Sequence, residues 1–95
     1  MCSIIVSNIL KNNLLQKANR FIQKRGPDHT SWGSANGITF VHNLLSLTGN
    51  YTEQPIQKNG IVVLFNGEIY NYRELDPNAS SDSFSIISAY EKFGP

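Results

Sequence analysis

Phe65-Asn66-Gly67-Glu68-Ile69-Tyr70-Asn71-Tyr72-Arg73-Glu74-Leu75 is the stretch that decides the fold, because an apolar segment ends there at an Asn-Gly-Glu triplet. The run 61–65 contains only β-branched, aliphatic and aromatic residues, as in a strand buried on both faces. An Asn-Gly pair between apolar runs usually closes a β-hairpin. Here, however, Ile69, Tyr72 and Leu75 follow at helical spacing, so the pattern favours a strand followed by a helix.

The triplet after this strand carries groups that are suited to binding. Asn66 offers a side-chain amide donor, Gly67 lets a ligand approach its backbone N–H, and Glu68 supplies a negative charge. Together these groups could hold a developing oxyanion and a cationic group. The end of the strand 61–65 is therefore the first candidate site.

The rest of the chain alternates between strand and helix patterns, which predicts one α+β domain over residues 1–95. Strands are expected at 2–7, 38–42 and 61–65, and helices at 9–23 and 84–93, the second helix capped by Ser81 or Asp82. Gly26 and Pro27 end the first helix, and residues 28–31 are expected to form a polar loop. A second loop, containing Gly49-Asn50 and Gln54-Pro55, is expected before the turn at 58–60.

Composition describes an ordinary small soluble domain of 95 residues, 40% of them apolar and 16% charged, with a net charge of +1. The eight Lys and Arg residues are spread along the chain, which argues against a phosphate-tracking stripe and a basic membrane-binding segment. We therefore expect no nucleic acid and no membrane among its partners. The N-terminus lacks a signal-peptide pattern and the single cysteine excludes an internal disulfide, so the expected location is cytoplasmic.

Cys2 is the second candidate, because removal of Met1 would give it a free α-amino group beside its thiol. An amine with a pKa near ~7.7–8.0 and a thiol with a pKa near ~8.5 can share a proton at neutral pH. A terminal nucleophile activated by its own amine is an established arrangement for attack on amides. The alternative is a small buried hydrophobic residue in the first strand, since cysteine is among the most buried residue types.

Cys2, Asp28, His29 and His42 could be proposed as a metal site. No close pair among them has the ligand spacing of a zinc site, and the chain has no glycine-rich phosphate loop. We therefore expect no metal and no cofactor. His42 ends an apolar strand and is expected to be packed and hydrogen-bonded.

Several short motifs appear in the order that they have in a known family. They are Met1-Cys2-Ser3-Ile4, Arg25-Gly26-Pro27-Asp28, His42-Asn43-Leu44-Leu45-Ser46-Leu47, Gln54-Pro55, the stretch from Asn66 to Leu75, and Ser81-Asp82 before a helix that ends at Phe93-Gly94-Pro95. Through these motifs the chain resembles the start of the glutaminase domain of asparagine synthetases, a class II glutamine amidotransferase of the N-terminal nucleophile hydrolase type. The resemblance extends over essentially all 95 residues and implies an αββα sandwich.

The resemblance implies hydrolysis of glutamine to glutamate and ammonia. Cys2 would attack the side-chain amide carbon of glutamine. By similarity, the side-chain amide of Asn66 and the backbone N–H of Gly67 would hold the oxyanion. The substrate-binding residues that the resemblance implies are Glu68 and Asp82, for the α-amino group of glutamine, and the backbone of the loop with Leu45 and Leu47.

Three departures from the family pattern accompany this resemblance. Leu44 stands where the family has an arginine that clamps the α-carboxylate of glutamine, and Ser3 replaces the glycine that usually follows the nucleophile. Arg73 or Arg25 would have to reach in to supply the missing cation. The chain also ends before the family's domain does, so a truncated sandwich without a synthetase domain is expected. A partner polypeptide or a homo-oligomer would then complete the fold, and the alternative function is a catalytically impaired binding or assembly module.

Overall fold

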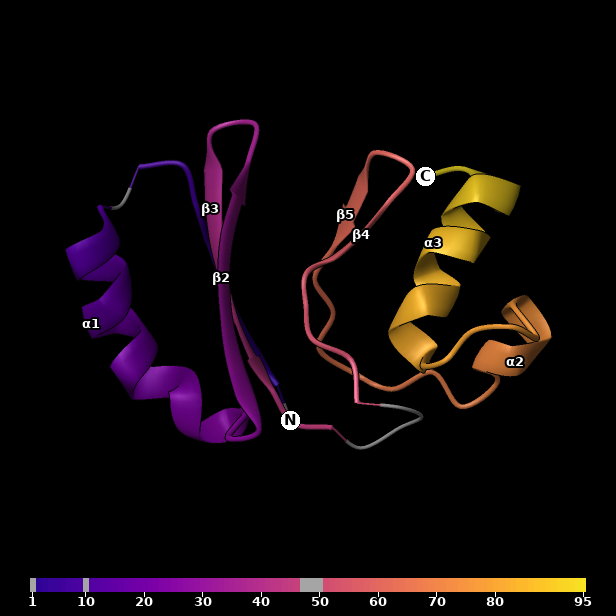
Figure 1. Cartoon of the computed structure of the whole chain (residues 1–95), viewed down its shortest axis with the longest axis horizontal. Coiled ribbons are helices and arrows are strands. Elements are labelled where there is room, and N and C mark those ends of the chain that lie inside the picture. Colours follow the sequence, from indigo (N-terminus) through magenta and orange to yellow (C-terminus); the bar gives the residue numbers. More distant parts are fainter. Residues whose placement is uncertain (1, 10, 47–50) are drawn as a thin grey trace.

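Two antiparallel sheets with helices outside them make up the chain in a computed structural model, which describes residues 2–9, 11–46 and 51–95 (Figure 1). The elements in chain order are β1 (Ser3–Ser7), α1 (Asn12–Ile22), the short 3-10 helix η1 (Gln23–Arg25), β2 (His29–Ala35), β3 (Ile38–Leu44), β4 (Ile56–Lys58), β5 (Ile61–Val63), α2 (Tyr72–Leu75) and α3 (Asp82–Phe93).

The elements form four layers in the order helix, sheet, sheet, helix (Figure 1). α1 covers a three-stranded sheet of order β1-β3-β2, and α3 lies beyond the two-stranded sheet β4-β5 at the other side of the molecule. All strand pairs are antiparallel. The expected α+β class is confirmed, and the order of layers is the one that the resemblance implies. Assignment to the N-terminal nucleophile hydrolase sandwich stays a prediction.

Two tight hairpins shape the sheets, and both turn on an Asn-Gly pair. Asn36 and Gly37 join β2 to β3 with φ values of 52° and 78°, and Asn59 and Gly60 join β4 to β5 with φ values of 53° and 76°. Positive φ at both central residues is the condition for the tightest hairpin turn, and Asn-Gly satisfies it best. The turn expected at 58–60 is confirmed. Neither Asn66 nor Gly67 has a positive φ, so the pair in the deciding stretch forms no such turn.

Two strands lie where loops were expected. β2 occupies the segment that was predicted to begin as a polar loop at 28–31, so that prediction was wrong. β4 follows Gln54-Pro55 of the second predicted loop, and this strand was not predicted. The sequence His29–Ala35 is rich in small polar residues, yet it alternates between half-buried and exposed positions as an edge strand paired only with β3. Its pairing partner, rather than its own composition, decides its conformation.

Helix α1 packs on the sheet through few apolar residues. It begins at Asn12, later than the expected residue 9, and it buries Leu15 and Asn19. The apolar residue Phe21 on the same helix is 87% exposed. Asn19 is buried because its amide exchanges hydrogen bonds with Asn43 on β3, at 2.6 and 3.4 Å.

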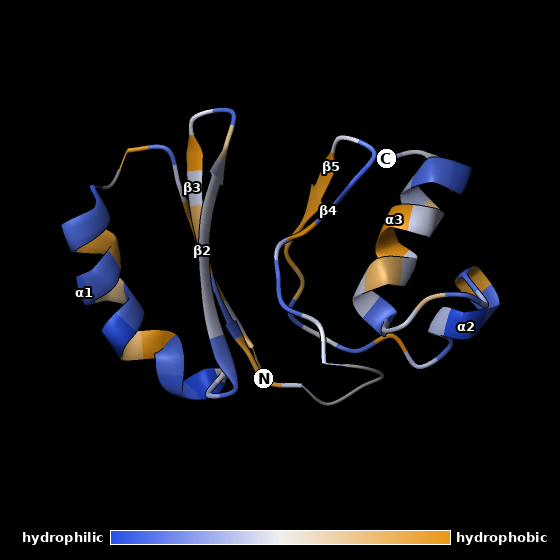
Figure 2. Cartoon of the chain, in the orientation of Figure 1, coloured by the Kyte–Doolittle hydropathy of each residue, from blue (hydrophilic) through white to orange (hydrophobic). Residues whose placement is uncertain are grey.

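An apolar cluster holds together the half of the molecule that contains β4, β5 and α3. Ile56 on β4, Val63 on β5 and Ile87 on α3 form its buried centre, with Phe65 and Phe84 packed against it among the partly buried residues. Figure 2 shows the apolar segments of β5 and α3 in adjacent layers. This cluster fixes the position of the segment that follows β5.

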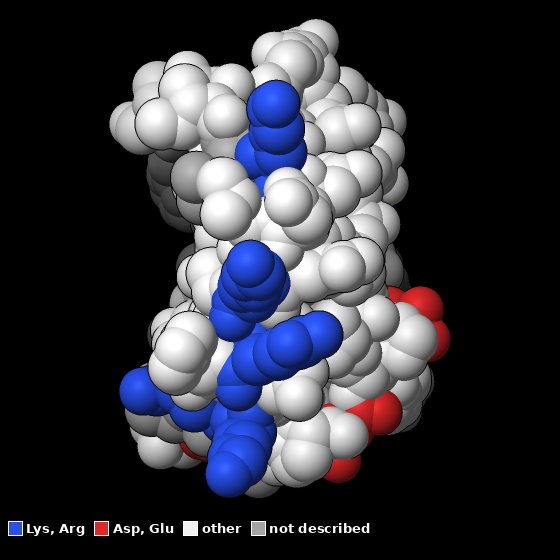
Figure 3. Space-filling view, turned by 90° about the vertical axis from the view of Figure 1, so that its left-hand side faces the viewer, with Lys and Arg blue, Asp and Glu red and all other residues white. Residues whose placement is uncertain are grey.

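Charge is distributed unevenly between the two halves. The segment 11–25 contains five of the eight basic residues and no acidic one: Lys11, Lys17, Arg20, Lys24 and Arg25. All five are exposed, and basic side chains gather along the α1 side of the molecule (Figure 3). None of the described helices combines the length and apolarity that crossing a bilayer requires.

Candidate active site

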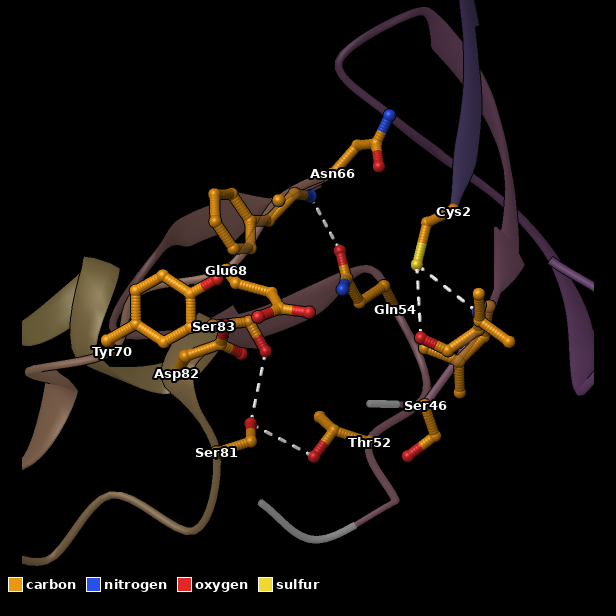
Figure 4. Close-up of a pocket in the computed structure, with 14 residues that line it drawn as sticks. Cys2, Ser46, Thr52, Gln54, Asn66, Glu68, Tyr70, Ser81, Asp82 and Ser83 are labelled. Atoms are coloured by element: carbon orange, nitrogen blue, oxygen red, sulfur yellow. Dashed lines mark hydrogen bonds between the residues drawn. The ribbon is translucent and has the colours of Figure 1, made fainter. Parts of the chain in front are cut away.

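A cavity of about 340 Å³ lies where the two halves of the molecule meet (Figure 4). Its volume is at the lower end of the ~300–1,000 Å³ range of small-molecule sites. Fourteen residues line it. They are Cys2, Leu44, Leu45, Ser46, Thr52, Gln54, Phe65, Asn66, Gly67, Glu68, Tyr70, Ser81, Asp82 and Ser83. Six predicted site residues thus share one cavity, namely Cys2, Leu45, Asn66, Gly67, Glu68 and Asp82, whereas Leu47 lies outside the described residues.

Cys2 is held at this cavity by the end of β3. Because β1 pairs antiparallel with β3, with Ser3 opposite Asn43, the residue before β1 comes to lie beside Leu45. The Leu45 N–H donates to the Cys2 Sγ at 3.2 Å, and the thiol lies 3.6 Å from the Leu45 carbonyl oxygen. Cys2 is 9% exposed, so the thiol is largely withdrawn from solvent but lines the cavity.

Ser3 turns away from the thiol. Its hydroxyl donates to the Ile22 carbonyl oxygen at 2.9 Å and accepts from the Asn43 side-chain amide at 2.9 Å. Thr30 on β2 donates to the same Asn43 side chain at 2.8 Å. The serine after the nucleophile position therefore belongs to a buried polar network between the sheet and α1, which anchors the start of β1 under Cys2.

Side chains hold the segment that carries Asn66 and Gly67, because the β5 ladder ends at Val63. The Gln54 Oε1 accepts from the Phe65 N–H at 2.6 Å, and the His42 Nε2 lies 3.3 Å from the Phe65 carbonyl oxygen. A carbonyl oxygen only accepts, so His42 donates from Nε2. Together Gln54 and His42 hold the backbone N–H and the carbonyl group of Phe65, the residue just before Asn66.

His42 is fully buried, and its Nδ1 has no hydrogen-bond partner among the described residues. The expectation of a hydrogen-bonded histidine is therefore right for one ring nitrogen and wrong for the other. Burial lowers the pKa of His42, and the bond to the Phe65 carbonyl opposes this effect only in part. The positioning role of His42 and Gln54 was missed. The Gln54-Pro55 motif does not indicate that the Gln54 side chain bonds to the backbone 11 residues later.

Two carboxylates lie on the side of the cavity opposite Cys2 (Figure 4). Asp82, the first residue of α3, is 7% exposed, and its Oδ2 accepts from the Ile69 N–H at 3.0 Å. This bond ties the residue after Glu68 to the start of α3, so the carboxylates of Glu68 and Asp82 face the same space. Glu68 itself is exposed.

Hydroxyl groups extend the polar wall beside Asp82. Thr52 donates to Ser81 at 3.1 Å, and the Ser81 and Ser83 hydroxyls lie 3.1 Å apart (Figure 4). Ser81 was expected as a helix cap; it precedes α3, but its side chain makes no capping bond. Thr52 and Ser83 were not predicted, because isolated hydroxyl residues carry no sequence signal for a site.

The loop after β3 is held by Asp28. Its Oδ2 accepts from the Ser46 N–H at 2.7 Å, and its own N–H donates to the Leu44 carbonyl oxygen at 2.9 Å. The Arg-Gly-Pro-Asp motif thus supports the cavity wall through its aspartate, whereas Arg25 is exposed and does not line the cavity. Arg73 does not line it either; its Nε contacts the hydroxyl of Tyr72 at 3.3 Å.

The cavity is acidic as a whole. Glu68 and Asp82 line it, and among the described residues no Lys, Arg or His does so. Residues 47–50, outside the described part, add no basic residue in the sequence. Within the described ranges, no three His, Cys, Asp or Glu residues are placed to hold a metal ion. The site therefore combines a buried thiol, an amide, two carboxylates and hydroxyls.

Comparison with known proteins identifies the class to which this fold and site belong. The chain belongs to the glutamine amidotransferase domain family, whose model matches residues 1–95. Relatives include asparagine synthetase [glutamine-hydrolyzing] 2 of Oryza sativa subsp. japonica, 27% identical over 99% of this chain and 19% of that protein. A putative asparagine synthetase [glutamine-hydrolyzing] of Mycobacterium tuberculosis (strain ATCC 25618 / H37Rv) is 34% identical over 84% of this chain.

The asparagine synthetase [glutamine-hydrolyzing] 2 of Bacillus subtilis (strain 168) is 34% identical over 77% of this chain and 11% of its own length. The chain thus spans less than a fifth of the length of these curated relatives. No solved structure matches it. The resemblance drawn from the motifs, an N-terminal glutamine amidotransferase domain of the asparagine synthetase type, is confirmed.

Proposed function

We propose that the chain hydrolyses the side-chain amide of glutamine to glutamate and ammonia, with Cys2 as the nucleophile. The observation that carries this proposal is the shared cavity, in which the thiol faces Asn66, Gly67 and the two carboxylates. Membership of the glutamine amidotransferase family supports glutamine as the substrate. The names of these relatives contain the term glutamine-hydrolyzing, which also supports glutamine as the substrate.

In the proposed reaction the Cys2 sulfur forms a bond to the amide carbon of glutamine. The side-chain amide of Asn66 and the N–H of Gly67 donate to the oxygen that becomes negative. The carbon–nitrogen bond then breaks, and ammonia leaves after accepting a proton, which leaves a glutamyl thioester. Water attacks this thioester, releases glutamate and returns the proton to the thiol. Once Met1 is removed, the α-amino group of Cys2 serves as the proton carrier.

Substrate orientation follows from the same geometry. The α-ammonium group of glutamine binds between Glu68 and Asp82, which brings its side chain towards Cys2 on the other side of the cavity. The loop with Leu45, and with Leu47 beyond the described residues, forms the remaining wall. A Cβ at Gly67 would lie 3.1 Å from the Phe65 ring, so a side chain at this position would crowd that ring.

The test is ammonia release from glutamine, measured together with the intact mass of the purified protein. We expect a mass without Met1, ammonia release by the wild type, and covalent labelling of Cys2 by a glutamine-analogue electrophile. The Cys2→Ala variant should release no ammonia and take up no label. A mass that includes Met1, or equal labelling of both proteins, would contradict the proposal.

A second candidate function is a binding or assembly module that has lost hydrolysis. Leu44 favours it, because this apolar side chain lines the cavity and is only 5% exposed, and no cation replaces it among the described residues. Ammonia release distinguishes the two functions. A binding module binds its ligand in the cavity and releases no ammonia, and its ligand affinity does not depend on the removal of Met1.

Additional polypeptide, from a partner chain or a second copy, is expected to cover the inner faces of the two sheets. Val6 on β1 is paired with Phe40 on β3. Val62 is the neighbour of Val63 on β5, so it points to the opposite face of the sheet, away from the cluster around Ile87. The side chains of Val6 and Val62 are 57% and 40% exposed. Light scattering on the purified chain tests this: a monomer at all concentrations, with unchanged behaviour after Val6→Ser, would contradict a self-associating surface.

A further inference from the structure

The charge of the cavity restricts the ligand that it can hold. Two carboxylates line it, and no basic side chain lines it among the described residues. A ligand with one positive end is attracted by this arrangement, whereas a carboxylate on the ligand would be buried without a partner. Burying an unpaired charge is among the most unfavourable events in a protein interior.

Free glutamine brings such a carboxylate with it. Its α-ammonium and α-carboxylate groups are bonded to the same carbon, so an ammonium group between Glu68 and Asp82 places the ligand's own carboxylate within a few ångströms of both. Leu44 and Leu45 offer apolar side chains nearby, and the hydroxyl groups of Thr52, Ser81 and Ser83 beside Asp82 carry no positive charge. The Leu45 N–H already donates to the thiol of Cys2.

The start of α3 offers no replacement for the missing cation. A helix N-terminus carries a partial positive charge that attracts anions. Here Asp82 is the first residue of α3, so this positive end already faces a carboxylate of the protein. Arg25 and Arg73, the cations considered from the sequence, do not line the cavity.

We propose that the preferred substrate class is a glutamine derivative with a free α-amino group and a neutral α-carboxyl end, such as glutaminamide or the N-terminal glutamine of a peptide. This inference rests on the proposed function. The reaction is unchanged: Cys2 attacks the side-chain amide carbon, the carbon–nitrogen bond breaks, ammonia leaves with a proton, and water converts the thioester to a γ-carboxylate. Only the group attached at the α-carbon differs.

Ligand binding to the Cys2→Ala variant tests the substrate class apart from the chemistry. Dissociation constants are measured by calorimetry for glutaminamide, glutamine and N-acetylglutamine. We expect glutaminamide to bind about 10- to 100-fold more tightly than glutamine, and N-acetylglutamine, which lacks the positive charge, to bind most weakly. Equal or tighter binding of glutamine, or no binding of glutaminamide up to about 10 mM, would overturn the proposal.

Two further variants tie the preference to the residues named. Leu44→Arg should reverse it, so that glutamine binds more tightly than glutaminamide, whereas the matched variant Leu44→Met should keep the wild-type order. Because Leu44 is buried and its arginine variant can fail to fold, Glu68→Gln provides an independent measurement at an exposed position. This variant should weaken the binding of glutaminamide by about tenfold and reduce the ratio between the dissociation constants of glutamine and glutaminamide. An unchanged ratio in Glu68→Gln would contradict the proposal.

Turnover on the wild type separates this inference from the proposed function. Ammonia release from glutamine with a kcat/KM equal to or above that for glutaminamide leaves the glutaminase proposal standing and overturns the substrate class. No ammonia from either compound, together with tighter binding of glutaminamide to Cys2→Ala, ends the proposed hydrolysis and supports the ligand class. A higher kcat/KM for glutaminamide supports both.

Discussion

Single residues determine how closely the chain can approach itself, and Gly26 is the clearest case. It is buried in the loop between η1 and β2, where a Cβ would lie 2.0 Å from the Asn43 carbonyl oxygen and 2.7 Å from the Leu44 nitrogen. Both atoms belong to the backbone of β3, which carries the wall of the cavity. Only a residue without a side chain permits this contact.

Gly26→Ala should therefore destabilise the chain strongly. Because the β3 backbone would have to move, we expect a loss of about 3 kcal/mol or more in the free energy of unfolding. Gly37→Ala is the matched control: its Cβ meets nothing within 4 Å, so only the φ of 78° is unfavourable. That variant should lose about 1 kcal/mol. Urea unfolding of both variants checks the difference, and equal losses would show that the close approach is unimportant.

The side chain of Asn66 provides the sharpest catalytic test at this scale. If it holds the oxyanion, Asn66→Ala should lower the rate of ammonia release by about 10²–10³. Asn71→Ala is the control in the same stretch, since the Asn71 side chain is exposed, contacts Glu74 at 3.4 Å and does not line the cavity. It should keep the wild-type rate. Similar losses in both variants would indicate damage to the segment rather than to the oxyanion contact.

At the scale of elements, a buried polar network joins α1 to the sheet that carries Cys2. Asn43 on β3 and Asn19 on α1 bond to each other, and Ser3 and Thr30 bond to Asn43 as well. All the hydrogen bonds described for the buried side chains of Asn19 and Asn43 lie within this network. Removing one member leaves buried partners without hydrogen bonds.

We expect Asn43→Ala to cost about 2–3 kcal/mol of unfolding free energy, and Asn19→Ala about 1–2 kcal/mol. The double variant should lose clearly less than the sum, because the two side chains share their bonds. Chemical denaturation of the four proteins in this cycle measures the coupling. Strict additivity would contradict the network.

Some elements could be predicted from sequence and others could not, for physical reasons. The runs around Val41 and Val63 are apolar enough to read as strands, and α3 follows from its helical pattern. β2 has no comparable pattern, because an edge strand needs few apolar residues when one neighbour supplies its hydrogen bonds. Asn66 and Asp82 were predictable as site residues because they stand in recognisable motifs. Gln54 also stands in a motif, but its role was not predictable, since it exists only through a contact across the fold.

At the scale of the whole molecule, His42 links the two halves. It stands on β3 and donates to the Phe65 carbonyl in the segment after β5. Burial keeps its pKa below the ordinary value of 6.5. The unfolded chain therefore takes up a proton on acidification before the folded chain does, so stability is complete above about pH 6.5 and falls as the pH drops through the lowered pKa.

Comparison of the wild type with His42→Gln checks this effect. Glutamine can still donate to Phe65 but does not titrate, so the variant should lose less stability than the wild type between about pH 7.5 and 5. The control Gly37→Ala leaves all titrating groups in place and should keep the wild-type slope. Thermal unfolding across this range gives the measurement, and parallel curves for wild type and His42→Gln would contradict it.

The sequence by itself determined the family of the chain, the α+β class and the identity of the candidate site residues. These properties depend on local patterns and on short motifs whose residues are adjacent in the sequence. Only the tertiary structure decided that Cys2 and Asn66 line one cavity, that β2 is a strand, and that no basic side chain lines the cavity within the described residues. Such facts depend on contacts between residues far apart in the chain, and a sequence pattern carries no record of which distant groups meet.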